Sequence, residues 1–365
     1  MRVSLFVMAA AALALLAAPV SAGNVTQDFI EGNPGLESAG PLAFGPDGVL
    51  FVGDSKGAAI VAIATGDTTA KSETGPFELE RIDQKIADLL GTTTEDVRVN
   101  DLAVGPSGAA FLSVSRGQGA EEVPLLLRAS RSGAITEVPL DGVRYSKAEL
   151  PNAPDPGAMR RGRSLRQLAI TDIVYQDGQV YVAGLSNEEF ASKLRVIPFP
   201  FTGVEAGTSV EIYHGNHGAW ETRSPIRTLV PYDIASDPHI LAAYTCTPLV
   251  TFPVKAVTGG GGKVTGTTVA ELGNRNRPLD MVVYQKDGRD YLLMANSSRG
   301  VMKVATEGIG SAKGITSEVE GVAGLSYETI AHLEGVQQLD RLDKEHALIL
   351  KEAGGGLDLT AVPLP

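Results

Sequence analysis

A short phrase recurs along this chain and limits the folds that it can adopt. In each copy a short apolar strand is followed by a turn rich in Gly, Asp or Pro and then by a second apolar strand. Clear copies run over 41–54, 100–115, 171–184 and 279–296, and weaker copies over 226–244 and 336–350. Turns such as Pro46-Asp47-Gly48 supply the positive φ that a tight hairpin needs. Six such hairpins, at intervals of roughly 50–70 residues, are typical of the blades of a β-propeller.

The repeat predicts a single all-β domain over residues 23–365, folded as a six-bladed β-propeller. We expect residues 24–30 to add a fourth strand to the last sheet, because a closed ring leaves no open strand edge. Two segments do not follow the rhythm. Apolar residues at helical spacing over 79–90, with Gly91 as a stop, predict a short helical insertion. Residues 144–166, rich in proline and arginine, are interpreted as a loop inserted between blades.

The phrase resembles the repeat of NHL-type propellers and of the gluconolactonase and paraoxonase group of six-bladed propellers. The likeness lies in the spacing of the repeated hairpins, and it extends over most of the chain after residue 22. It implies a central tunnel that holds a hard cation such as calcium on carboxylate and amide oxygens. Side chains that could supply such oxygens here are Asn100, Asp172, Glu188 and Asn296. The activity implied by the resemblance is metal-dependent hydrolysis of the lactonase type.

The first residues have the pattern of a secretory signal peptide. Arg2 precedes an apolar stretch over 3–18, and small residues up to Ala22 suit a cleavage site. The stretch is shorter than the roughly 20 residues that a membrane span needs. We therefore predict a signal peptide over 1–22 and a periplasmic or secreted protein. The single cysteine, Cys246, excludes an internal disulfide bond.

Composition excludes some functions and leaves the question of catalysis open. With 31 Lys and Arg against 43 Asp and Glu, the net charge of −12 argues against a nucleic-acid-binding protein. The chain has no G-x-S-x-G elbow, P-loop or Rossmann fingerprint, so no enzyme class is indicated. A single Trp and 5% aromatic residues disfavour recognition of sugars by stacking. We expect a monomer without a membrane span.

Polar residues concentrate on one predicted face of the propeller. Loops that enter the innermost strands and loops that follow the second strands emerge on the same face, which makes that face the functional candidate. Because Arg binds carboxylate and phosphate groups, the face predicts a small anionic ligand or a protein partner. In the alternative interpretation the aspartates tie neighbouring blades together and the arginines pair with them. The candidate ligand-binding residues are Arg116, Arg223, Arg277, Arg299, Asp101, Asp172, Asp280, Glu188 and Asn296.

The same face carries a candidate metal site. His214 and His217 share one glycine-containing loop, and Cys246 lies in a neighbouring loop of the same predicted blade. Imidazole and thiolate ligands together suit zinc or copper. Cys246 could instead be a buried structural thiol. The sequence thus predicts an exported propeller that binds a ligand or partner, with a divalent metal (zinc, copper or calcium) as its candidate cofactor. A metal-dependent hydrolase or lyase of the lactonase-like type is the alternative.

Overall fold

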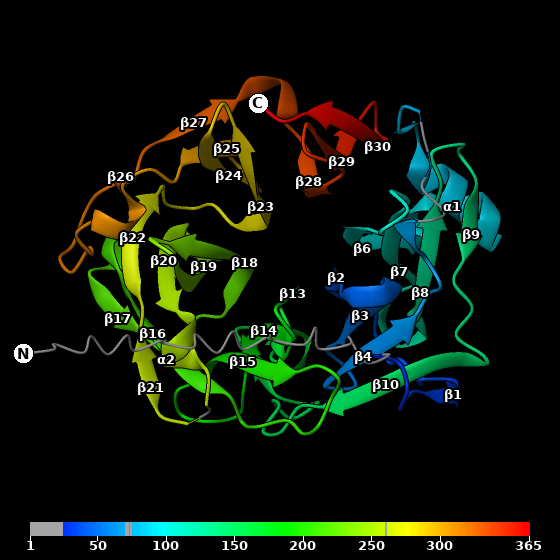
Figure 1. Ribbon diagram of the computed structural model, residues 1–365, viewed down its shortest axis with the longest axis horizontal. Coiled ribbons are helices and arrows are strands. Elements are labelled where there is room, and N and C mark those ends of the chain that lie inside the picture. Colours follow the sequence, from blue (N-terminus) through cyan, green and yellow to red (C-terminus); the bar gives the residue numbers. More distant parts are fainter. Residues whose placement is uncertain (1–24, 70–72, 74, 260) are drawn as a thin grey trace, which may run out of the picture.

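The computed structural model describes residues 25–69, 73, 75–259 and 261–365. Six sheets of four or more strands surround a central axis in this part of the chain, which confirms the predicted six-bladed propeller (Figure 1). No helix within the described ranges is long and apolar enough to cross a bilayer. The predicted signal peptide, residues 1–22, lies outside the described residues.

Each copy of the recurring phrase forms the inner hairpin of one blade. Blade 1 contains β2 (Leu42–Phe44), β3 (Val49–Asp54), β4 (Ala59–Ala64), β10 (Val143–Glu149) and β1 (Ile30–Gly32). Blade 2 contains β6 (Val97–Val104), β7 (Ala110–Arg116), β8 (Val123–Ala129) and β9 (Ile135–Glu137). Blade 3 contains β13 (Asp172–Gln176), β14 (Gln179–Leu185), β15 (Ser192–Pro198), β16 (Thr208–His214) and β17 (Ala219–Glu221), with β21 (Lys263–Thr265) parallel to β16.

The remaining three blades follow the same plan. Blade 4 contains β18 (Ile226–Ile234), β19 (Asp237–Tyr244), β20 (Pro248–Pro253), β22 (Thr267–Leu272) and β26 (Val322–Gly324). Blade 5 contains β23 (Pro278–Lys286), β24 (Arg289–Asn296), β25 (Gly300–Ala305) and β27 (Tyr327–Ile330). Blade 6 contains β28 (Val336–Arg341), β29 (His346–Ala353), β30 (Gly356–Pro363) and β5 (Glu78–Leu79).

The blades do not follow one another around the ring in chain order. The innermost strands pack in the order β2, β6, β28, β23, β18 and β13, and β13 returns to β2 (Figure 1). Blade 1 therefore lies between blades 2 and 3, and blade 2 is inserted between the third and fourth strands of blade 1. Buried apolar clusters fill the seams of blade 1 with 2, 1 with 3, 2 with 6 and 5 with 6, and one larger cluster joins blades 3, 4 and 5. Packing on both faces explains why the strand residues do not alternate cleanly between apolar and polar.

Closure of the ring differs from the sequence prediction in the segment that it uses. An N-terminal segment does complete the last sheet, but it is β5 that pairs with β30. The predicted segment, 24–30, was the wrong choice, because β1 pairs instead with β10 at the outer edge of blade 1. Both segments are short and carry no turn signal, so the sequence could not separate them.

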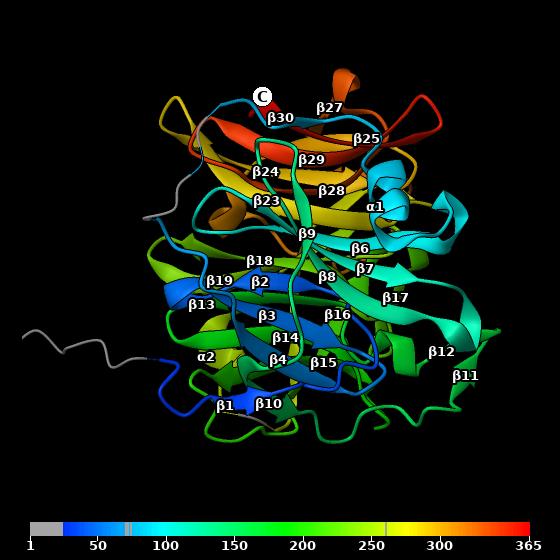
Figure 2. The same ribbon diagram turned by 90° about the vertical axis from the view of Figure 1, so that its right-hand side faces the viewer.

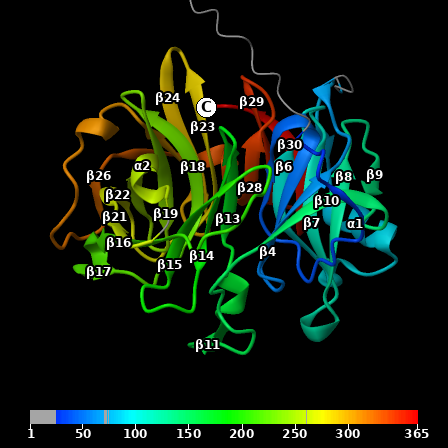
Figure 3. The same ribbon diagram turned by 60° about the horizontal axis from the view of Figure 1, so that its bottom comes forward.

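The two predicted insertions had different outcomes. Helix α1 (Ile82–Leu90) confirms the helical insertion, ends at Gly91 in the left-handed conformation, and packs against β30 and β6 (Figure 2). The interpretation of 144–166 as a loop was wrong in its first part, because β10 is the fourth strand of blade 1. The later part forms the hairpin of β11 (Met159–Arg160) and β12 (Arg163–Ser164), which projects from the body of the propeller (Figure 3). A second helix, α2 (Val254–Val257), follows β20.

Candidate functional site

The loop after β16 of blade 3 and the turn between β19 and β20 of blade 4 bring His214, His217 and Cys246 together, so the prediction that both loops belong to one blade was wrong. His214 ends β16, His217 lies in the turn after it, and Cys246 lies in the turn between β19 and β20. One potential ligand atom from each residue lies within 4.8 Å of the others. The centres of the two imidazole rings are 3.7 Å apart. The three residues that the sequence suggested as metal ligands are therefore close neighbours in the fold.

Glu221, on β17, fixes both imidazole rings. Its Oε1 lies 3.1 Å from Nδ1 of His214 and 2.7 Å from Nδ1 of His217. Burial alone would raise the pKa of Glu221, but hydrogen bonds from His214, Ser224 and His217 lower it to about 2. An ionised carboxylate only accepts hydrogen bonds, so both Nδ1 atoms donate. In the neutral imidazoles the lone pairs then lie on Nε2, which is the usual arrangement around a metal ion.

The Nε2 atom of His214 is buried and has no hydrogen-bond partner among the described residues. The His214 side chain is only 2% exposed, so bulk water does not reach it. The nearest carboxylate oxygen is Oε2 of Glu271, at 3.9 Å, which is too long for a hydrogen bond. Glu271 accepts hydrogen bonds from the backbone N–H of Gly215 and the side chain of Asn216, and burial raises its pKa. A buried polar atom left unpaired in this way requires an explanation.

The turn that carries Cys246 has a strained backbone. Cys246 and Thr247 have φ angles of 68° and 57°, in the left-handed region that β-branched residues such as Thr rarely adopt. The turn is held by a hydrogen bond from the Cys246 N–H to the Asn276 carbonyl (2.6 Å) and one from the Thr247 hydroxyl to the Gly273 carbonyl (2.9 Å). Cys246 is half-buried, and its Sγ lies 3.8 Å from Oδ1 of Asn274. The half-buried thiol does not match the fully buried structural cysteine of the alternative interpretation.

The aspartates of the predicted face line the central axis and tie the blades together. Asp101 accepts a hydrogen bond from the Leu42 N–H (2.6 Å), Asp172 from the Leu229 N–H (2.7 Å) and Asp280 from the Leu339 N–H (2.9 Å). Each bond joins the inner strand of one blade to the inner strand of the next. A fourth aspartate, Asp340, bonds the Val104 N–H (2.7 Å) in the same way. These contacts support the structural interpretation of the aspartates.

Burial raises the pKa of all four aspartates, to about 7 for Asp172 and about 6 for Asp340. The pKa values of Asp101 and Asp280 are raised well above the usual value by burial and also by the negative charges of neighbouring aspartates. No salt bridge among the described residues joins these aspartates to Arg116, Arg223, Arg277 or Arg299. An arginine–aspartate ion-pair ring is therefore not part of the described structure.

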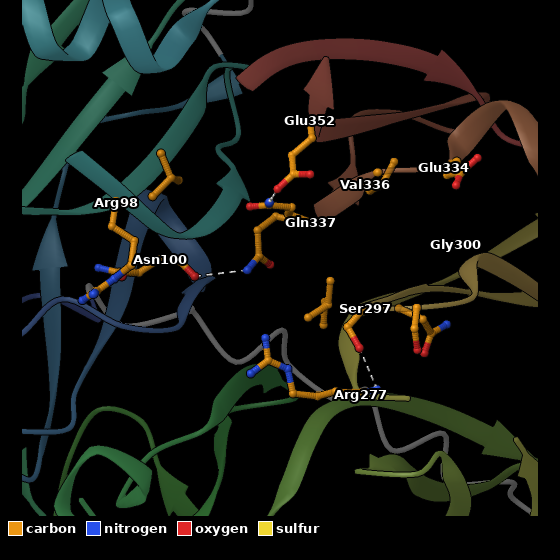
Figure 4. Close-up of a pocket in the computed structure, with 15 residues that line it drawn as sticks. Arg98, Asn100, Arg277, Ser297, Gly300, Glu334, Val336, Gln337 and Glu352 are labelled. Carbon is orange, nitrogen blue, oxygen red and sulfur yellow. Dashed lines mark hydrogen bonds between the residues drawn. The ribbon is translucent and has the colours of Figure 1, made fainter. Parts of the chain in front are cut away.

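A cavity of about 570 Å³ opens beside the inner ends of blades 2, 5 and 6. Of the four predicted arginines, Arg277 lines it, and Figure 4 shows its side chain extending into the space. The backbone N–H of Arg277 donates to the Ser297 hydroxyl, and its guanidinium group forms no salt bridge with a described carboxylate. The Arg223 side chain bonds the Glu189 carbonyl, and the Arg299 side chain bonds the Asn274 carbonyl. Arg116 ends β7, outside the lining of this cavity.

The possible calcium ligands have separate partners. Asn100 donates to the Ala39 carbonyl and the Ser115 hydroxyl, and Glu188 pairs with Lys193 and Asn152. The buried Asn296 accepts a hydrogen bond from Asn276 and donates to the Met294 carbonyl. No hydrogen bond joins any two of Asn100, Asp172, Glu188 and Asn296 in the described part of the chain.

Sequence reasoning missed several residues of these sites. Glu221 could have been found, because it follows His217 by four residues in the same loop. Asp101 and Asp280 are the first paired residues after the bulges of β6 and β23, whereas Asp340 lies two residues beyond the equivalent residue of β28, Gln338. Arg227 lies inside a strand, and its position in the sequence does not indicate a functional role. Its side chain donates to the Thr245 hydroxyl, next to Cys246.

Comparisons with known proteins place the chain in no family. No family model and no curated protein matches it, so the NHL-type or gluconolactonase-like identity stays a prediction. Among solved structures it is similar to a PQQ-bound aldose sugar dehydrogenase from Streptomyces coelicolor, with 12% identity and a TM-score of 0.36 over 92% of this chain and 96% of that chain. It is also similar to the plexin A4 extracellular region, with 12% identity and a TM-score of 0.40 over 92% of this chain and 46% of that chain. At these TM-scores, function has to be argued from the chain's own residues.

Proposed function

We propose that this protein binds a transition metal ion, zinc or copper, through His214, His217 and Cys246. The observation that carries the proposal is the buried, unpartnered Nε2 atom of His214. A carboxylate that holds both Nδ1 atoms and a half-buried thiol beside the rings support it. Bond lengths of about 2.0 Å to nitrogen and about 2.3 Å to sulfur bring ligand atoms within about 4 Å of one another. Small side-chain rotations of Cys246 and of the exposed His217 would shorten the present distances between the ligand atoms, which lie within 4.8 Å of one another.

The donor set favours zinc or copper over calcium, because calcium takes six to eight oxygen ligands. Three protein ligands leave a fourth position for water or a ligand, as in catalytic zinc sites. The alternative function, a metal-dependent hydrolase or lyase, would use that position for water. We also propose that the protein is exported, as its N-terminal pattern predicts.

The test is a metal titration of protein that has been treated with EDTA and dialysed. We expect the wild-type protein to bind one equivalent of zinc or copper, and Cys246→Ser to lose at least tenfold in affinity. His346→Ala is the matched control, since His346 contacts Asp343 at the other end of the chain and should leave the affinity unchanged. Equal affinity in the wild-type protein and Cys246→Ser would contradict the proposal.

A second candidate function, binding of a small anionic ligand on the same face, rests on three arginines. Burial lowers the pKa of Arg227, and the positive charges of Arg277 and Arg163 each lower it further, so Arg227 lies within electrostatic reach of both. Within the described ranges none of them forms a salt bridge with a carboxylate. Unpaired like charges in an acidic protein favour a bound carboxylate or phosphate group.

Calorimetric titration of the metal-free protein with inorganic phosphate and with malonate tests this second candidate. We expect Arg277→Gln to weaken binding about tenfold, because one charge-assisted hydrogen bond is worth about 1.5–3 kcal/mol. Arg116→Gln is the control, since Arg116 lies on blade 2 outside the cavity. Absence of binding by the wild-type protein, or equal binding by Arg277→Gln, would contradict it.

A further inference from the structure

The seam between blades 1 and 3 contains two buried positive charges that none of the sites above uses. The chain crosses this seam where it leaves β10 and enters β13. On β15, Lys193 and Arg195 lie two residues apart, so they share one face of the strand. Their side chains are buried, at 3% exposed for Lys193, while the Arg195 residue is 1% exposed. Burial of one charged side chain is uncommon, and burial of two neighbours requires compensation.

Lys193 has partners for its charge. Its Nζ forms a salt bridge with Glu188 (2.7 Å) and donates to the Ser209 hydroxyl (3.0 Å). Glu188 in turn accepts a hydrogen bond from Asn152, which follows β10 of blade 1. The Glu188 carboxylate is therefore already paired with Lys193 and Asn152.

Arg195 does not have such partners. Within the described part of the chain, its Nη2 reaches the Pro151 carbonyl, at 3.5 Å, and its buried Nε and Nη1 atoms have no hydrogen-bond partner. Burial lowers the pKa of Arg195 to about 10, so the group still carries its charge at neutral pH. A Cβ atom added at Gly207 would lie 2.4 Å from Cγ of Arg195, which shows how closely the backbone holds the side-chain stem. The guanidinium group is therefore fixed in place, charged and incompletely hydrogen-bonded.

The charges at this seam leave an excess of one positive charge. Lys193 and Arg195 contribute two positive charges, and Glu188 contributes one negative charge. A buried guanidinium with unmade hydrogen bonds is unfavourable by several kcal/mol unless something compensates it. A bound anion with a single negative charge would balance the excess positive charge and accept the unmade hydrogen bonds.

We propose that a small monovalent anion, a halide or an oxyanion of the size of formate or nitrate, binds to the unpartnered N–H groups of Arg195 at this seam. Pro151, whose carbonyl contacts Arg195, also lines a cavity of about 460 Å³ between the end of blade 1 and the segment around Phe201. The cavity adjoins the seam through Pro151, and Arg195 itself lies outside its lining. The anion stabilises the contact between blades 1 and 3, and its binding is independent of a metal at His214.

The experiment measures the melting temperature of the full chain in chloride, bromide and formate, at constant ionic strength set with bulky gluconate. The wild-type protein should show a saturable rise of roughly 2–4 °C, because a ligand that binds only the folded state stabilises it. Glu188→Gln raises the local excess to two positive charges, so its half-saturating anion concentration should fall about tenfold. Arg195→Met should abolish the saturable rise. Arg289→Gln, at an exposed arginine that begins β24 on blade 5, should behave like the wild-type protein.

Several outcomes would overturn the proposal. A wild-type melting temperature without a saturable anion dependence would do so, as would an unchanged dependence in Arg195→Met. If Arg195→Met does not fold, Glu188→Gln decides, because an unchanged half-saturating concentration contradicts the charge argument. Crystals grown in bromide give a direct reading, since an anomalous peak is expected beside the Arg195 guanidinium and its absence at saturating bromide counts against the site.

Discussion

The His/Cys corner beside blade 4 and the aspartates on the central axis look alike in the sequence, yet they differ in how their polar atoms are satisfied. Each central aspartate accepts a backbone N–H from a neighbouring blade. His214 instead keeps a buried Nε2 without a partner, beside a half-buried thiol. Satisfied acceptors hold a fold together, whereas an unsatisfied buried atom indicates a place where something else binds. The comparison separates polar residues with structural partners from the residues that we propose as a binding site.

The largest effect that we expect is on stability, from Asp172→Ala. The substitution removes the acceptor of the Leu229 and Ile173 N–H groups, so the free energy of unfolding should fall by about 2–4 kcal/mol. The metal content of the folded protein should not change. Chemical denaturation measures the effect, with Asp177→Asn as the control, because Asn tolerates the positive φ of this exposed turn residue. Loss of metal without loss of stability would reverse the roles assigned to the two regions.

A smaller effect is expected from Glu221→Gln, which keeps the shape of the side chain and removes its charge. The amide oxygen of glutamine is an uncharged and weaker acceptor for the two imidazole N–H groups, so metal affinity should fall about 10–100-fold. Competition with a chelator of known affinity measures the change. Glu211→Gln, on β16 beside Lys263, is the matched control. If both variants bind metal as tightly as the wild-type protein, Glu221 does not orient the ligands.

The smallest effect that we expect is a dependence of stability on pH, which arises from the central aspartates. The pKa values of Asp172 and Asp340, about 7 and about 6 in the folded protein, lie above the usual value of about 3.9 for the unfolded chain. The stability that these groups contribute is therefore complete below about pH 4 and is lost as the pH rises through 6–7. The melting temperature of metal-free protein should fall by a few degrees from pH 5 to pH 8. Asp172→Asn should flatten this slope, and a slope that rises with pH in the wild-type protein would contradict the account.

The inner hairpins could be predicted because turn chemistry is local. A turn such as Asp287-Gly288 needs positive φ, and both residues adopt it in the structure. The order of the blades could not be predicted, because the outer strands β5 and β10 carry no turn signal and are placed by packing alone. Turn signals in the sequence identify the segments that form hairpins, but they do not identify which hairpins pack side by side in the ring.

The candidate metal ligands could be predicted because propeller topology sends their two loops to the same face. The unpartnered atoms of His214 and Arg195 could not, because neither burial nor the absence of a partner is visible in residue types. The suggested pairing of arginines with aspartates failed for a related reason. Backbone N–H groups of the neighbouring strands lie closer to the carboxylates than any arginine does.

X-ray absorption at the metal edge tests the central claim most directly, because it counts the atoms around the ion. For protein loaded with one equivalent of zinc or copper, we predict one sulfur at about 2.3 Å and two imidazole nitrogens at about 2.0–2.1 Å. Cys246→Ser should lose the sulfur shell. A first shell made only of oxygen, or a spectrum that is unchanged in Cys246→Ser, would contradict the claim that this corner is a metal site.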